Sequence, residues 1–248
     1  MEIVPLGDSA LIVCVRDRFE DAPDEALNEV LRTFRRLQDA AIPGVIELVP
    51  AYTTVAVFFD PMVVASAGPK PDQALDWLTE RVHAVVAAIG DRGRAAVFPA
   101  RVVEIPVCYD PEFAPDLERV AQHAQMSPNE IIDLHSTAKY RVNCIGFTPG
   151  FPYLSGLPKK LATPRHAEPR KKIPAGSVAI GGAQTGIYPQ QSPGGWNVIG
   201  RTPSPMFDPA KNPPALLRAG DRVQFRVITR AEFESLSVKA LKRQSGEA

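Results

Sequence analysis

Three arginines are placed where their side chains could grip an anion. Arg165 and Arg170 each follow a proline, and Arg201 follows a glycine. Proline restricts the backbone and glycine permits close packing, so each guanidinium can be held in one direction. A fixed guanidinium binds a carboxylate or phosphate through two parallel hydrogen bonds, whereas Lys159 and Lys160 are point charges on flexible stems. We therefore expect Arg165 and Arg170 to bind an anionic substrate, Arg201 to act in catalysis, and the lysines to be solvated.

Glycines and neutral polar residues surround these arginines within residues 145–203. Such glycines allow positive φ angles or close approach of the backbone to a ligand, and the prolines among them stiffen the loops. Amide, hydroxyl and aromatic side chains add hydrogen-bonding groups and stacking surfaces. Alternatively, the glycines are the turns of a β-barrel and the aromatic residues fill its core. The further residues expected to bind substrate are Gly181, Gln184, Gly186, Tyr188, Ser192, Gly194, Gly195 and Trp196.

One histidine and one cysteine lie near this segment in the chain. His135 ends a predicted helix just before a predicted strand, and it is either a catalytic proton-transfer residue or a structural hydrogen-bonding residue. Cys144 lies in an apolar strand pattern without an adjacent base, which favours a buried, inert thiol. The three cysteines of the chain have no metal-ligand spacing, so we predict neither a metal site nor a disulfide framework. The segment contains no P-loop, dinucleotide-binding, serine-hydrolase or zinc-protease signature.

Composition indicates an ordinary globular protein. The 248 residues include 28 Lys and Arg against 28 Asp and Glu, which excludes a globally basic nucleic-acid-binding protein and a disordered polyelectrolyte. Residues 141–214 differ from the rest, because they hold 13 of the 25 prolines and nine Lys or Arg against two acids. No apolar run reaches the roughly 18 residues of a membrane helix, and the start lacks a leader pattern. We expect a cytoplasmic protein that binds neither membrane nor nucleic acid.

Hydrophobic periodicity predicts two domains. Strands at residues 3–4, 10–15, 45–49 and 53–59 and helical stripes at 27–41 and 75–89 give the order ββαββα, typical of a two-layer α+β domain. A polar joint at residues 90–94 places the boundary between residues 92 and 93. The second domain, 93–248, is predicted to be mainly β with helices at 116–124 and 128–135. The latter begins with a capping box at Ser127 and Glu130, contains no Lys or Arg, and so does not suit a DNA-reading helix. The tail from residue 239 is expected to fray.

Several long motifs make the chain similar to a known family. GFTPGFPYLSGLP, IPAGSVAIGG, QTGIYP and SPGGWNVIGRTP, with PLGDSAL near the start and LLRAGDRVQF near the end, resemble the allophanate hydrolase subunit 1 family. The resemblance covers almost the whole chain. It implies an α+β N-terminal domain at residues 1–92 followed by a cyclophilin-like β-barrel domain at 93–248. His166 departs from the family pattern, which has a second arginine at this position.

The resemblance also implies a function in an assembly. Family members include the B-type subunit of an ATP-dependent 5-oxoprolinase, which opens 5-oxo-L-proline to L-glutamate. A lactam is a poor electrophile, so coupling to ATP can activate its carbonyl before water attacks. The implied partners are an allophanate hydrolase subunit 2-type protein (the KipA-like, C-type subunit of 5-oxoprolinase) and a LamB/YcsF-like protein (its A-type subunit). We expect the isolated chain to be inactive and ATP to be bound by this chain or by a partner.

Two other functions are open at this point. Family members also include KipI-like inhibitors, for which the partner is a histidine kinase. Related domains in urea carboxylases and allophanate hydrolases imply a carboxyltransferase-type subunit instead.

Overall fold

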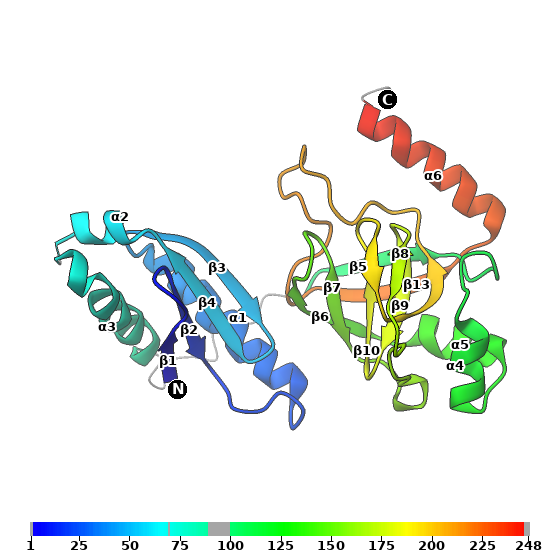
Figure 1. Cartoon of the computed structure of the whole chain (residues 1–248), viewed down its shortest axis with the longest axis horizontal. Coiled ribbons are helices and arrows are strands. Elements are labelled where there is room, and N and C mark those ends of the chain that lie inside the picture. The colour runs from blue at the N-terminus through cyan, green and yellow to red at the C-terminus, as the bar shows by residue number, and fades with distance from the viewer. Residues whose placement is uncertain (1, 69, 89–99, 246–248) are drawn as a thin grey trace. The chain divides into compact units, whose positions relative to one another are not determined.

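The chain forms two compact units, residues 1–100 and 101–248 (Figure 1). This computed structural model describes residues 2–68, 70–88 and 100–245. The predicted joint at residues 90–94, with the domain boundary between 92 and 93, lies outside the described residues.

The N-terminal unit is a two-layer α+β structure. Its antiparallel sheet has the order β1-β2-β4-β3, with β1 at Glu2–Pro5, β2 at Ala10–Cys14, β3 at Val45–Ala51 and β4 at Thr54–Phe59. The helices are α1 at Pro23–Ala40, α2 at Pro61–Ser66 and α3 at Ala74–Ala87, and a 3₁₀ turn η1 covers Pro71–Gln73. Alternate residues of β4 are buried, as expected for a strand with one face on a core. The apolar stripes of α1 and α3 pack into the same core as β2 and β4.

The C-terminal unit is a barrel built from seven strands. The strand order is β12-β9-β10-β7-β6-β13-β5, in which only the β13–β5 pair is parallel. Backbone N–H groups of Cys108 and Arg201 each donate to the other residue's carbonyl at 2.9 Å, so the chain just after β5 meets the end of β12. The strands are β5 at Val102–Val107, β6 at Tyr140–Ile145, β7 at Pro152–Ser155, β9 at Ser177–Gly181, β10 at Gln184–Ile187, β12 at Asn197–Arg201 and β13 at Arg222–Val227.

Shorter elements surround the barrel. They are α4 at Leu117–Ala124, α5 at Pro128–Thr137, η2 at Lys159–Leu161, the paired strands β8 at Arg170–Ile173 and β11 at Ser192–Gly194, and α6 at Arg230–Ser245. The predicted capping box is confirmed, because Ser127 Oγ accepts from the Glu130 backbone and the Ser127 backbone donates to Glu130 Oε2 at 2.8 Å. The expectation that the chain frays from residue 239 is wrong: α6 continues to Ser245, and its first half is held by Phe233 packing on Phe113.

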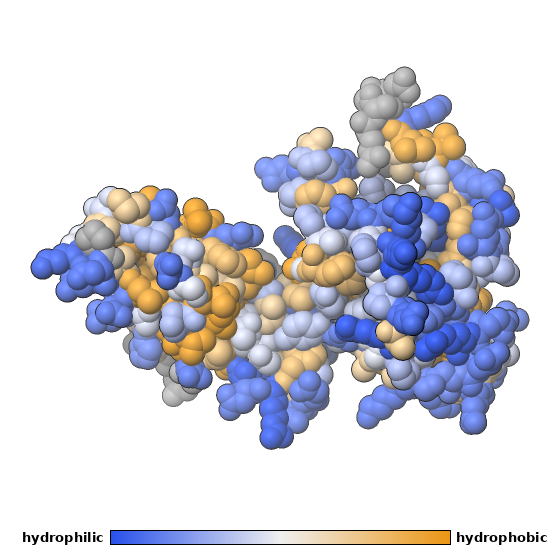
Figure 2. All heavy atoms as spheres, in the orientation of Figure 1, coloured by the Kyte–Doolittle hydropathy of each residue, from blue (hydrophilic) through white to orange (hydrophobic). Residues whose placement is uncertain are grey.

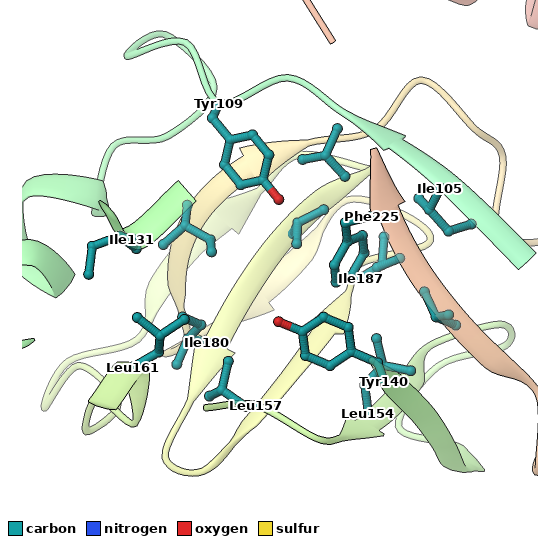
Figure 3. Close-up of a cluster of buried hydrophobic side chains, with 14 of the residues drawn as sticks. Ile105, Tyr109, Ile131, Tyr140, Leu154, Leu157, Leu161, Ile180, Ile187 and Phe225 are labelled. Carbon is teal, nitrogen blue, oxygen red and sulfur yellow. The ribbon is translucent and has the colours of Figure 1, made fainter. Parts of the chain in front are cut away.

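The barrel interior holds the main core, and Figure 3 shows its side chains converging from several strands. Val178 and Ile180 of β9 belong to this interior, whereas Ala179 belongs to a separate cluster. Successive residues of a strand point to opposite faces, so the second cluster lies on the outer face of the wall. The structure confirms the expected fold class, an α+β domain followed by a cyclophilin-like barrel domain. Among the described helices, none is long and apolar enough to cross a membrane.

Asp116, immediately before α4, fastens the edge of β12. Its backbone N–H donates to the Val198 carbonyl at 2.9 Å, and its Oδ2 accepts from the Val198 N–H at 2.7 Å. Arg170 of β8 donates from both terminal nitrogens to the same carboxylate, at 2.6 and 2.7 Å. His166 Nε2 lies 3.1 Å from Asp116 Oδ1 and fills the remaining acceptor direction. One buried carboxylate thus joins α4, β8 and β12.

We predict that Asp116→Ala destabilises the fold by about 3 kcal/mol, because it leaves the Val198 N–H and the Arg170 guanidinium without their partner. Urea unfolding measures this change. Glu118→Ala is the matched control, since Glu118 is an exposed acid in the first turn of α4 and should change the free energy of unfolding by less than about 0.5 kcal/mol. Equal stability of the two variants would contradict the prediction.

Candidate functional site

A cluster of aromatic rings covers the outer face of β9, β10 and β7. Phe151 lies at its centre, with ring centroids 4.9 Å from Tyr153, 5.2 Å from Tyr188 and 5.6 Å from Trp196. All the pairs are tilted or edge-to-face, the arrangements that aromatic quadrupoles prefer. Phe147 extends the cluster at 5.7 Å from Phe151. We call Phe147, Phe151, Tyr153, Tyr188 and Trp196 the outer aromatic cluster.

Arg165 adds a cation to this cluster. Its guanidinium carbon lies 5.4 Å from the centroid of the Trp196 ring, within range of a cation–π interaction. The side chain is exposed, and among the described residues no carboxylate lies within ion-pair distance of it. The exposed guanidinium is therefore available to an anion while the Trp196 ring lies beside it. Arginine can combine contact with an aromatic ring and bidentate recognition of an anion.

Three of the predicted glycines provide the space that these rings occupy. A Cβ at Gly186 would lie 2.9 Å from the Phe151 ring, and a Cβ at Gly181 or Gly194 would overlap Trp196 or Tyr188 even more closely. None of the three has a positive φ, so the close approach, rather than an unusual backbone conformation, requires glycine here. The approaching group is the protein's own aromatic ring. Gly195 differs, since its nearest neighbour would be the His166 carbonyl oxygen at 3.4 Å.

Neutral hydrogen-bonding groups lie beside the rings. Burial raises the pKa of the Tyr188 and Tyr153 hydroxyls, so both stay protonated at neutral pH. Ser192 is 9% exposed, and within the described part of the chain its Oγ has no hydrogen-bond partner. Gln184 is half-buried at the start of β10. Most of this face is nevertheless covered by the protein, because Tyr188 and Phe151 are each 2% exposed and Trp196 is 6% exposed. Arg165 and Phe147 are the exposed side chains here.

The structure does not bring the three predicted arginines together. Arg170 is held by Asp116, while Arg201 Nε donates to the Ala175 carbonyl at 2.9 Å and its guanidinium lies 5.9 Å from the Phe113 ring. Arg201 ends β12, whereas Trp196 immediately precedes that strand, so Arg201 lies at the opposite end from the outer aromatic cluster. Of the three, Arg165 alone stacks on this cluster.

His135, the predicted catalytic histidine, lies inside the barrel. It is 0% exposed and stacks on Phe225 with ring centroids 4.7 Å apart. Thr185 Oγ1 donates to the Ala179 carbonyl, so it accepts from His135 Nε2 at 3.1 Å. Nδ1 then accepts from the Tyr109 hydroxyl at 2.8 Å. Both ring nitrogens are hydrogen-bonded within the core, so His135 is a structural residue in this fold. Its catalytic role stays a prediction, and its buried position does not support that role.

Sequence reasoning missed four residues of these arrangements. Phe147, Phe151 and Tyr153 stand in the GFTPGFPYL motif, where two of the rings alternate along one strand face, and this spacing could have indicated a shared surface. Asp116 had no such signal, because it is 54 residues from Arg170 and carries no local pattern.

Comparison with known proteins places this architecture in a family. The chain combines a two-layer α+β unit with a barrel whose outer face carries packed aromatic rings and an arginine. The family model described as "Carboxyltransferase domain, subdomain C and D" matches residues 1–217, and the chain belongs to that family. The matched range covers the N-terminal unit and continues into the C-terminal unit as far as residue 217.

Relatives in this family carry a specific name. A protein from Bacillus subtilis (strain 168), named as the B subunit of 5-oxoprolinase, is 42% identical over 239 residues, covering 94% of this chain and 95% of that protein. A protein of the same name from Escherichia coli O157:H7 is 43% identical over 197 residues, covering 79% and 83%. The crystal structure of TTHA0988 superposes with a TM-score of 0.72 at 35% identity, covering 88% of this chain and 40% of that longer chain. These findings confirm the resemblance stated from the sequence motifs.

Gly181→Ala should disrupt the outer aromatic cluster, because the added methyl overlaps the buried Trp196 indole. We expect a loss of about 1–3 kcal/mol in the free energy of unfolding, as overpacking typically produces, and a changed Trp fluorescence spectrum. Gly195→Ala is the control, since it meets nothing closer than ordinary van der Waals contact and has no positive φ. If Gly181→Ala matches the wild type in both measurements, the proposed packing role of Gly181 is wrong.

His135 should make stability fall in acid. Burial lowers the pKa of His135 to about 3, whereas an unfolded histidine has a pKa of about 6.5. Below about pH 6.5 the His135 imidazole is protonated in the unfolded chain but stays neutral in the folded chain. The free energy of unfolding therefore decreases as pH falls. Between pH 7 and pH 5 the wild type should lose about 2 kcal/mol more than His135→Gln. His123→Gln, at an exposed histidine of α4, should keep the wild-type pH dependence, and the same profile in all three proteins would refute the assignment.

Proposed function

We propose that this chain is a component of an ATP-dependent 5-oxoprolinase, which opens 5-oxo-L-proline to L-glutamate. The observation that carries the proposal is identity of 42% to a protein named as the B subunit of 5-oxoprolinase, across 94% of this chain and 95% of that one. Similarity over the whole length means that both units, and not the barrel alone, are shared. The outer aromatic cluster with Arg165 is the surface that we assign to the reaction.

The ligand chemistry of this surface suits 5-oxoproline. The substrate has a carboxylate, which the exposed edge of Arg165 can bind bidentately. Trp196 is 6% exposed, so in this proposal it supports Arg165 instead of touching the substrate. The Arg165 contact would bind and orient the substrate.

Partner subunits supply the rest of the reaction in this proposal. A phosphate cradle needs several converging N–H groups and cations, but in the described residues Arg170 is bound to Asp116 and Arg201 lies at the other end of β12. Of the three predicted arginines this leaves Arg165 alone for a phosphate, and we propose that ATP binds to a partner. The expected partners are a subunit 2-type protein and a LamB/YcsF-like protein. In this proposal the isolated chain is inactive and gains activity on assembly.

The test is reconstitution of the complex. We expect the purified chain to show no 5-oxoproline-dependent ATP hydrolysis, and the chain with both partners to show it. In the complex, Arg165→Ala should lower kcat/KM about tenfold to a hundredfold, because it removes a charged hydrogen-bonding contact. The Lys159→Ala/Lys160→Ala variant is the matched control at two exposed cations and should stay within about twofold. ATP hydrolysis by the chain alone would contradict the division of roles, and a damaged lysine variant beside a normal Arg165→Ala would contradict the site.

Carboxyl transfer is the second candidate function, and the description of the family model favours it. An assembled complex that moves a carboxyl group between substrates, without hydrolysing ATP in response to 5-oxoproline, would support it over the first. Binding to a histidine kinase stays an expectation from the sequence resemblance.

A further inference from the structure

Phe147 is a large apolar side chain held out in solvent. Phe147 is 64% exposed. By contrast, Phe151 near this loop is buried and Phe207 is partly buried. Within the outer aromatic cluster, the Phe147 ring packs edge-to-face with Phe151, with the two ring centroids 5.7 Å apart. Burial in the fold therefore does not account for a phenylalanine here.

The backbone at Phe147 also disfavours this residue type. The Thr148 N–H donates to the Gly146 carbonyl at 2.8 Å, so the hydrogen bond spans Phe147 alone and closes a three-residue γ-turn. Phe147 has φ +68°, which marks the rare, strained form of this turn. Glycine adopts positive φ without strain, and the chain uses glycine at the adjacent position 146 and again at 150. A phenylalanine at the strained position is the kind of local conflict that marks a functional site.

The loop that carries Phe147 is nevertheless fixed. Backbone hydrogen bonds join Gly146 to Phe151 at 3.1 Å and Phe151 to Thr148 at 3.0 Å. Gly150 sits so close to Met206 and Phe207 that a Cβ would lie 2.8–3.0 Å from them. The backbone that carries the ring is therefore held in place, and a partner that binds the ring does not have to order this loop.

We propose that Phe147 is an interface anchor that inserts into an apolar pocket of the subunit 2-type protein of the complex. This inference rests on the proposed function, because its occupant is a component of that complex. Phe147 projects as a loop tip, so it is suited to be the inserted group rather than the wall of a site. Rigid aromatic residues that fill a partner's pocket dominate the energetics of protein interfaces.

Charge identifies the surroundings of that pocket. Exposed cations lie at the cluster that Phe147 adjoins, because Arg165 lies over the Trp196 ring. Strand β8 carries Lys171 and Lys172 and ends at Ile173, which packs in the same cluster. Figure 2 shows hydrophilic side chains gathered over β8, where Lys171 and Lys172 are exposed. Complementary potentials steer association, so the rim of the partner's pocket carries an excess of Asp and Glu. Binding should accordingly weaken as salt increases.

The decisive variant is Phe147→Gly, which removes the ring and relieves the positive φ together. We expect its free energy of unfolding to equal or exceed that of the wild type, while its Kd for the partner rises by about thirtyfold or more, as for an interface hot spot. Gln125→Gly is the matched control. Gln125 is exposed at the end of α4 with φ +55°, so glycine relieves strain there without removing an anchor, and its Kd should match the wild type.

Calorimetry of the full-length chain with the purified partner separates the outcomes. If the wild type binds the partner and Phe147→Gly binds it equally well, Phe147 is not an anchor, and the proposed complex is unaffected by this result. No wild-type binding at all overturns the assembly in the proposed function and this occupant with it. If Gln125→Gly weakens binding as much as Phe147→Gly does, the loss comes from the change to glycine in the backbone, and the anchor role of Phe147 is wrong. Phe147-dependent binding to phosphatidylglycerol vesicles, with partner affinity unaffected, assigns the ring to a lipid surface and overturns the proposal.

Discussion

The Asp116 carboxylate is the interaction on which the outer face of the barrel depends. It accepts from the β12 backbone at Val198 and from both terminal nitrogens of Arg170, with only 4% of its side chain exposed. A buried carboxylate is tolerable only when its acceptor directions are filled, and here strand edge, guanidinium and His166 fill them. Because β12 follows Trp196 directly, fastening this edge also fixes where the indole lies. The position of the indole in turn determines the ring over which the Arg165 guanidinium lies.

Arg170 and Arg165 illustrate how neighbouring residues of one type acquire different tasks. Both follow prolines and both were expected to bind an anion. Arg170 meets a carboxylate of its own chain, so its charge is used in holding the fold. Arg165 meets an aromatic face, which leaves its hydrogen-bonding edge directed elsewhere. His166, which stands where the family pattern has arginine, still contributes a ring nitrogen to the same carboxylate.

The two faces of the barrel wall divide stability from recognition. Inside, His135 is enclosed by rings and hydroxyl groups and is held neutral, so it serves the core. Outside, glycines bring the backbone against buried aromatic rings, and Arg165 and Phe147 stay exposed beside them. Rigid aromatic groups recognise partners and ligands with little entropic loss. A subunit that binds and orients, while other chains supply ATP chemistry, is consistent with this division.

The sequence by itself determined the elements whose signals are local. The Ser127 capping box, the stripes of α1 and α3 and the two-residue alternation of β4 each report a period or a cap within a few residues, and the long motifs identified the family. Tertiary structure decided what lies far apart in the chain. Asp116 and Arg170 are 54 residues apart, and the backbone of Cys108 pairs with that of Arg201 where the first and last strands of the sheet meet. No local pattern encodes which guanidinium finds a buried carboxylate, because that choice depends on how the strands close and on the free energy of burying charge.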